Sequence, residues 1–246
     1  MARAVGDLLA EFDAELEREL VVPPSWNIAP TTEVPVLLER LVDGGVKRQL
    51  HVARWGLIPS WAKDPGMGAK MVNARSESVS EKPAFRESVK SRRCAVPADG
   101  YYEWKKGQGP AKQPYYVHAA DGGGMVFAGL YEWWMDPAKA AGDPGRWILS
   151  MSILTAASPT EGAEPSVLSE LNSLHDRMPL PMSSQTMKAW LDPAADDPPA
   201  LVSMIQAEAR GVAEGWKIVP VGAPVGSVRN DSPDLIQPVQ VPQTLF

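Results

Sequence analysis

Apolar residues recur at helical spacing near the start of the chain and at strand spacing through its middle. An amphipathic helix is predicted over residues 5–20 by the positions of Val5, Leu8, Leu9, Phe12, Leu16 and Leu20. Residues 33–40 and 46–55 read as two strands, and Asp43-Gly44-Gly45 between them is a turn signal. This region is therefore expected to form a β-hairpin.

Shorter strand patterns follow, and helical patterns return near the C-terminus. The segment KMVNAR predicts a buried strand that ends at Asn73, and EKPAFRESVKSR predicts a short helix. Further strands are expected at 94–97, 101–105, 114–118, 125–133, 147–156 and in WKIVPVG, and helices at 183–192 and 198–210. We predict a single α+β domain over residues 1–238, with a curved, mainly antiparallel, barrel-like sheet and flanking helices, and a loose tail over residues 239–246.

Composition narrows the class of protein. No apolar run approaches 18 residues, which predicts no membrane span, and the acidic N-terminus is unlike a secretory signal. The single cysteine, Cys94, excludes an internal disulfide framework and fits a reducing cytoplasm. The three histidines and Cys94 lack metal-ligand spacing, and the chain has no phosphate-binding glycine loop, so we expect neither a metal nor another cofactor.

The net charge of −6 argues at first against a nucleic-acid partner. The segment from Met71 to Lys106 nevertheless carries eight Lys and Arg against five Asp and Glu. Such a segment can bind a few phosphates with a modest salt dependence. A solvated helix face explains the same charges equally well.

Three polar residues are candidates for chemistry. Asn73 ends an apolar segment and can hold a substrate through paired donors and acceptors, although a turn residue is the simpler reading. Glu103 lies among Tyr101, Tyr102 and Trp104; partial loss of hydration favours its protonated form and makes it a candidate general acid or base, unless it is an edge-strand residue in water.

His175 is the third candidate, and a lone histidine is more often structural. It is followed at once by Asp176 and Arg177, and Arg177 is suited to a phosphate. Trp61 and Trp104 are candidate platforms for stacked bases, although most of the nine tryptophans must serve packing.

Nine ordered segments carry a family resemblance: WNIAPT, WGLIPSWAKD, MVNARSES, EKPAFR, RRCAVPADGYYEWK, KQPYYVH, FAGLYEWW, ILTAA and HDRMP. Together they resemble the SRAP family, the SOS response-associated peptidases or abasic-site processing proteins. The resemblance implies recognition of abasic sites in single-stranded DNA during the DNA damage response, by a cytoplasmic, nucleoid-associated monomer. It further implies covalent attachment through an N-terminal cysteine, whose amine and thiol close a thiazolidine ring on the sugar aldehyde.

The family roles carry over to matching positions. The resemblance implies that Asn73 holds the N-terminal residue or the adduct, that Glu103 transfers protons, and that His175 assists acid and base steps. It assigns phosphate contacts to Arg75, Arg86 and Arg177, and places Trp61 and Trp104 beside the DNA.

The start of the chain departs from the family pattern. Family members usually begin Met-Cys-Gly-Arg, whereas this sequence begins MARAVGDLL and has Ala2 at the second position. Either the gene start lies further upstream or the protein is a divergent member; as given, the chain is not expected to form a thiazolidine. A non-catalytic binder of single-stranded DNA and a true peptidase remain alternatives, although no Ser-His-Asp or Cys-His set is legible.

Overall fold

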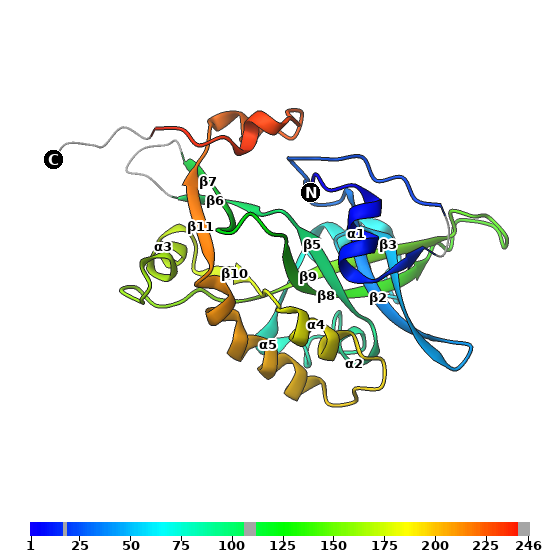
Figure 1. Ribbon diagram of the computed structural model, residues 1–246. Helices are drawn as coiled ribbons and strands as arrows, with labels where there is room; N and C mark the ends of the chain where they lie inside the picture. Colours follow the sequence, from blue (N-terminus) through cyan, green and yellow to red (C-terminus); the bar gives the residue numbers. More distant parts are fainter. Residues whose placement is uncertain (17–18, 106–111, 241–246) are drawn as a thin grey trace.

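The computed structural model describes residues 1–16, 19–105 and 112–240. Its centre is a barrel of five strands: β2 (Glu33–Val42), β3 (Gly45–Trp55), β5 (Arg93–Ala98), β8 (Met125–Met135) and β9 (Trp147–Ala157) (Figure 1). Neighbouring strands are antiparallel except β3 and β9, whose parallel pairing at Arg54 and Ser150 closes the ring. The predicted single α+β domain with a barrel-like, mainly antiparallel core is confirmed.

The predicted hairpin is also confirmed, as β2 and β3. Asp43 and Gly44 both have positive φ, 51° and 81°, which is the two-residue turn that matches strand twist. Residues 34–38 of β2 are all buried, so this strand reads as a continuous apolar run because it is covered on both faces.

Strand β9 organises the region where the candidate site lies. Beyond its pairing with β3, one edge of β9 continues in parallel with β4 (Asn73–Arg75). Beyond its pairing with β8, the other edge continues antiparallel to β10 (Arg177–Pro179). Two short segments from distant parts of the sequence thus flank the C-terminal half of β9.

The N-terminal helix is shorter than the periodicity predicts. Helix α1 (Val5–Phe12) ends where Asp13 takes a left-handed conformation with φ 49°. The chain then forms β1 (Glu15–Leu16), whose Leu16 pairs in parallel with Leu50 of β3. The predicted helix over residues 5–20 is therefore wrong over 13–16 and 19–20, because Leu16 is taken up by the barrel edge; residues 17–18 lie outside the described residues.

The bounds of two further elements differ from expectation, and two elements were not predicted. Strand β4 begins at Asn73, the residue where the sequence predicted a strand to end. Helix α2 is reduced to Ser88–Ser91, preceded by turns. Helix α3 (Ser166–Leu174) and β10 carry no strong sequence signal of their own and are recognisable only by what they pack against.

Helices α4 (Ser184–Leu191) and α5 (Pro198–Ala213) agree with their predicted positions and lie together below the sheets in Figure 1. Strand β11 (Trp216–Pro220) joins β7 (Gln113–Ala119) and β6 (Tyr101–Lys105) in a second, antiparallel sheet. The remaining short helices are η1 (Pro65–Lys70), η2 (Ser76–Ser78), η3 (Ala223–Gly226) and η4 (Pro233–Ile236). From residue 241 on, the predicted tail lies outside the described residues.

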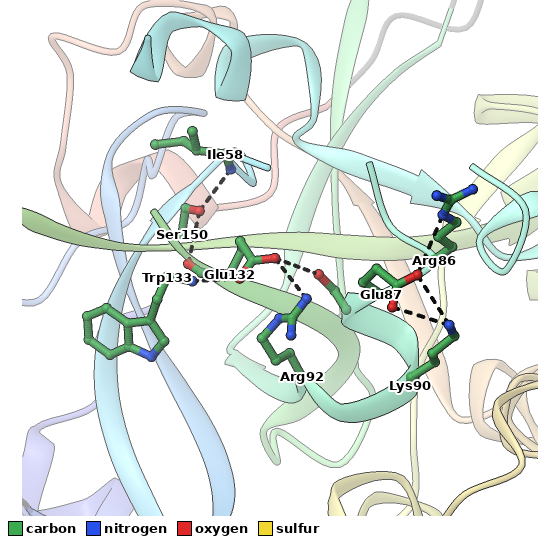
Figure 2. A network of polar contacts seen from close by, with 9 residues as sticks. Ile58, Arg86, Glu87, Lys90, Arg92, Glu132, Trp133 and Ser150 are labelled. Carbon is green, nitrogen blue, oxygen red and sulfur yellow. Dashed lines mark hydrogen bonds and ion pairs between the residues drawn. The ribbon is translucent and has the colours of Figure 1, made fainter. Parts of the chain in front are cut away.

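A buried polar network ties α2 to the barrel (Figure 2). The Glu132 carboxylate on β8 accepts hydrogen bonds from Arg92 Nη2 at 2.9 Å and Ser88 Oγ at 3.5 Å. Burial raises the pKa of Glu132, and Arg92 acts against that shift. Ser150 Oγ accepts from the Ile58 N–H at 2.8 Å and donates to the Glu132 carbonyl at 3.3 Å. These hydrogen bonds connect β9 to β8 and to the loop after β3.

Candidate active-site cleft

A cleft of about 840 Å³ opens between the barrel, the second sheet and the two ends of the chain. Six of the residues singled out in the sequence line it: Asn73, Arg75, Glu103, Trp104, His175 and Arg177. Trp61 and Arg86 are not among its lining residues. The candidate acid, amide and imidazole, predicted from separate segments, therefore lie around one cavity.

Strand β9 accounts for one wall of this cleft. Asn73 pairs in register with Ile153, and Arg75 with Thr155. On the opposite edge Arg177 pairs with Ala157. Asn73 and Arg75 are exposed, so their side chains are available to a ligand.

Strand β6 supplies the facing wall. The chain leaves β5 and passes through Asp99 and Gly100 into β6. A Cβ at Gly100 would lie 2.5 Å from the Val117 carbonyl oxygen, so only glycine allows β6 to approach β7 this closely. This close approach sets the position of β6 and, with it, the position of Glu103.

The alternation predicted for β6 is present. The Tyr101 ring packs edge-on against Phe127 and Trp216, each at 5.9 Å, whereas Tyr102 packs beside Trp104 at 6.5 Å on the other face. Burial, with the charge of Glu103 adding to it, raises the pKa of the Tyr101 hydroxyl.

The Glu103 carboxylate is only partly engaged. Its Oε1 accepts a hydrogen bond from the Trp104 N–H at 3.0 Å, and Glu103 is partly buried. Among the described residues no other hydrogen bond or ion pair to it is present, which leaves the second oxygen available to a ligand.

His175 follows α3 and has an extended backbone. Its side chain is 49% exposed. Its Nδ1 lies 3.0 Å from the Arg177 N–H, which can only donate, and 3.1 Å from an Asp176 carboxylate oxygen, which can only accept. A ring that accepts from this N–H is neutral and carries its hydrogen on Nε2, whereas a ring with a hydrogen on Nδ1 can donate to Asp176 or to the Arg177 carbonyl oxygen, which lies 3.2 Å away.

The two cleft arginines differ in their partners. Arg177 forms a two-point ion pair with Glu77, at 3.0 Å and 2.9 Å, and its side chain is 18% exposed. Within the described part of the chain, Arg75 has neither a hydrogen-bond nor an ion-pair partner. Arg75 is therefore the freer cation at the cleft.

The N-terminal segment contributes to the cleft in a way that the sequence did not predict. Met1 and Ala2 line the cavity, and the Met1 amine donates to the Ser25 carbonyl at 2.7 Å. The Ala2 N–H and Arg3 Nε both donate to Asp99, at 2.5 Å and 2.9 Å. Burial lowers the pKa of the Met1 amine, while Asp99 acts in the opposite direction.

The segment of residues 225–236 also lines the cleft and is hydrogen-bonded to the loop that contains Trp26 and Asn27. Asn27 Nδ2 lies 3.0–3.1 Å from the carbonyl oxygens of Val225, Ser227 and Asn230. The Tyr102 hydroxyl donates to the Trp26 carbonyl at 2.7 Å, which connects this loop to β6. Nothing in the sequence predicts this pairing, because the partners are about 200 residues apart.

The two predicted DNA contacts outside the cleft are both on the surface. The Trp61 residue is 56% exposed. The Arg86 side chain is 54% exposed and lies 3.5 Å from Glu87 (Figure 2). Their assignment as DNA contacts stays a prediction.

Three further features bear on metal binding, thiol reactivity and membrane insertion. Within the described ranges no group of three or more His, Cys, Asp or Glu side chains is placed to hold a metal ion. Cys94 is fully buried in the barrel, and burial raises the pKa of its thiol. No helix in the described part of the chain is long and apolar enough to cross a bilayer.

Comparison with known proteins supports the resemblance of the sequence motifs to the SRAP family. The family described as "SOS response associated peptidase (SRAP)" matches residues 1–228. The abasic site processing protein YoqW of Bacillus subtilis (strain 168) is 36% identical over 238 residues, covering 94% of this chain and 96% of the relative. The abasic site processing protein YedK of Escherichia coli (strain K12) is 31% identical over 239 residues, covering 95% of each chain.

The fold recurs in a crystal structure of a protein from Bacteroides thetaiotaomicron, with a TM-score of 0.74 at 22% identity over 98% of each chain. Sequence identity, coverage and fold thus agree over almost the whole length. The chain belongs to the SRAP family.

Proposed function

We propose that this protein binds single-stranded DNA and forms a covalent link to abasic sites in the cleft. Its relatives YoqW and YedK are named abasic site processing proteins. The observation that carries the proposal is that the N-terminal segment opens into the same cavity as Asn73, Glu103 and His175. An amine there would meet an aldehyde beside a proton donor, an amide and an imidazole.

The covalent step begins with attack of an N-terminal amine on the aldehyde carbon of the opened sugar. The amine loses a proton, the aldehyde oxygen gains one, and loss of water from this adduct gives an imine. Glu103 delivers and removes these protons, because it lines the cavity and one of its oxygens has no hydrogen-bond partner among the described residues. Asn73 holds the N-terminal residue or the adduct, and His175 assists the acid and base steps, including release.

A neutral amine is the nucleophile, and burial shifts the Met1 amine toward that form. A thiazolidine requires in addition a thiol next to the amine, which adds to the imine carbon while the nitrogen takes the proton. Residue 2 of this sequence is alanine, and Cys94 is buried. We infer that a stable link depends on an N-terminal cysteine, and that the sequence as given forms at most a reversible imine.

The strand itself is held by charge and stacking. Arg75, with no partner within the described residues, is the foremost phosphate contact, and Trp104 lines the same cleft. Arg177 presents part of its guanidinium to the cavity, and Trp61 and Arg86 extend the path outside it. Phosphate contacts carry no damage information, so they should act equally on intact and abasic strands.

The test compares protein–DNA adducts on denaturing gels after incubation with an abasic single strand. The sequence as given should yield an adduct only when borohydride reduces the imine. The variant Ala2→Cys with Met1 removed should yield a heat-stable adduct. Adding Glu103→Ala should slow its formation about 10²-fold or more, without changing affinity for the intact strand.

Failure of the Ala2→Cys variant to form any adduct, with or without borohydride, would refute the covalent proposal. Retained binding of the strand in that case would leave the second candidate, a non-covalent binder of single-stranded DNA. The specific observation in favour of the second candidate is Ala2 itself.

A further inference from the structure

Glu77 does not itself line the cleft, but it is paired with Arg177, which does. It lies within the segment MVNARSES, and no role was predicted for it. Both of its carboxylate oxygens accept hydrogen bonds from the guanidinium of Arg177, which is 100 residues away in the sequence. This pair joins η2, directly after β4, to β10. It therefore connects the two short segments that flank the C-terminal half of β9.

The pair leaves Arg177 almost fully occupied. Its Nε donates to Thr155 Oγ1 at 3.3 Å, and its Nη2 donates to the Thr155 carbonyl at 2.6 Å as well as to Glu77. Nη1 makes a single bond, to Glu77. Of the five N–H groups of an arginine, one on Nη1 thus remains without a partner within the described residues.

The backbone of Arg177 extends this arrangement to His175. The Arg177 N–H donates to His175 Nδ1 at 3.0 Å. The Arg177 carbonyl oxygen lies 3.2 Å from the same nitrogen, so the backbone of Arg177 contacts His175 Nδ1 through both of its polar groups. Whatever fixes Arg177 therefore also fixes the orientation of the imidazole and the balance between its two neutral tautomers.

Electrostatics works against a simple binding role for Glu77. A carboxylate beside a phosphate-binding cleft repels the strand and neutralises the nearest guanidinium. Its contribution must then be to geometry, since two parallel hydrogen bonds define the plane of Arg177 as a single point charge cannot.

We propose that Glu77 is a positioning residue, which holds Arg177 and through it His175 in the cleft wall, at the expense of affinity for the strand. This inference rests on the proposed function. It gives Glu77 opposite effects on two measurable quantities: it weakens binding and accelerates reaction.

The first arm of the test uses no DNA. Long-range ¹H–¹⁵N spectra of histidine rings at about pH 8.5, where an ordinary histidine is neutral, distinguish the bare nitrogen from the protonated one; His175→Gln identifies the relevant signals. We expect one predominant tautomer of His175 in the wild type and a different ratio of the two tautomers in Glu77→Gln. The matched control is Glu81→Gln, because Glu81 is exposed and its substitution makes the same change of charge four residues away.

The second arm measures affinity for an intact single strand by fluorescence anisotropy and the rate of borohydride-trapped adduct with a saturating abasic strand. Glu77→Gln should bind the intact strand a few-fold more tightly, with a steeper salt dependence by about 0.7, the slope of one further phosphate contact. Its saturated adduct rate should fall about tenfold, and Glu77→Asp should recover part of that rate. Glu81→Gln should leave the adduct rate and the tautomer unchanged.

Two results would overturn the inference. One is a His175 spectrum in Glu77→Gln identical to that of the wild type. The other is an adduct rate in Glu77→Gln that follows affinity upward instead of falling. If the wild type binds no DNA at all, the proposed function fails, while the spectra still decide whether Glu77 positions His175.

Discussion

Replacing Arg93 with methionine should destabilise the domain by about 3–5 kcal/mol, because five carbonyl oxygens lose the side chain that donates to them. Arg93 is the first residue of β5 and is 4% exposed. Its guanidinium donates to five carbonyl oxygens at the ends of α2 and α4: those of Val89, Lys90, Trp190, Asp192 and Ala195. It also lies 5.8 Å from the centre of the Trp190 ring.

The magnitude follows from what the carbonyls lose. An arginine has five N–H donors, and here each has a carbonyl partner, four of them at N···O distances of 2.6–3.2 Å. The last carbonyls of a helix have no partner within the helix, so the side chain satisfies groups that would otherwise be orphaned. The Asp192 carbonyl is the exception, because it also accepts from the Ala195 N–H at 3.2 Å. Each orphaned acceptor costs about 1–3 kcal/mol, and water reaching the less buried ones reduces the total to the range given.

Urea unfolding followed by tryptophan fluorescence measures this effect, with Arg86→Met as the matched control. Arg86 is an exposed arginine from the same region, and its substitution should change stability by no more than about 0.5 kcal/mol. Arg93→Lys should fall between the two, because an ammonium keeps the charge but has three donors and no fork. If Arg93→Met unfolds at the same urea concentration as Arg86→Met, with the same slope, the carbonyl cluster is not stabilising and the reasoning is wrong.

Three other predictions concern the site and the barrel. Gly100→Ala should cost about 1–3 kcal/mol and shift β6, lowering adduct yield, because its Cβ would clash with Val117 O and the Tyr116 ring; a crystal structure with β6 unmoved would contradict this. Cys94 should react with a thiol reagent only after urea unfolds the barrel, since its thiol is buried and burial raises its pKa; fast labelling of the native protein would count against the burial. Glu132 has a raised pKa when folded, so its contribution is complete below the unfolded pKa and is lost as pH rises through the folded one. Glu132→Gln should therefore compare more favourably with the wild type at pH 7 than at about pH 4, and urea midpoints at both pH values that differ by the same amount would show otherwise.

Local patterns predicted the elements whose signals are local. The strand over residues 101–105 agrees with β6 at both ends, and the hairpin turn at Asp43 and Gly44 is present with the required positive φ. Both depend on alternation and turn chemistry within a few residues. Helix α1 shows the limit of such patterns, because its apolar spacing continues through Leu16 while the backbone there pairs with β3.

The candidate site divides in the same way. The residue types at Asn73, Glu103 and His175 were visible because polar groups stood in unusual company. Asp99 and Glu77 were not visible, because their partners, Ala2 and Arg177, are distant in the sequence and no spacing relates them.

The sequence by itself determined the strand alternation, the tight turns, the absence of metal-ligand spacing and the family, since each is written in neighbouring residues or in ordered motifs. Only the tertiary structure decided that β3 closes the barrel on β9, that β4 and β10 flank the same strand, and that the N-terminal segment lies in the cleft beside Glu103. The physical reason is that these contacts are selected by burial and hydrogen-bond pairing between distant segments, and their energies leave no periodic trace along the chain.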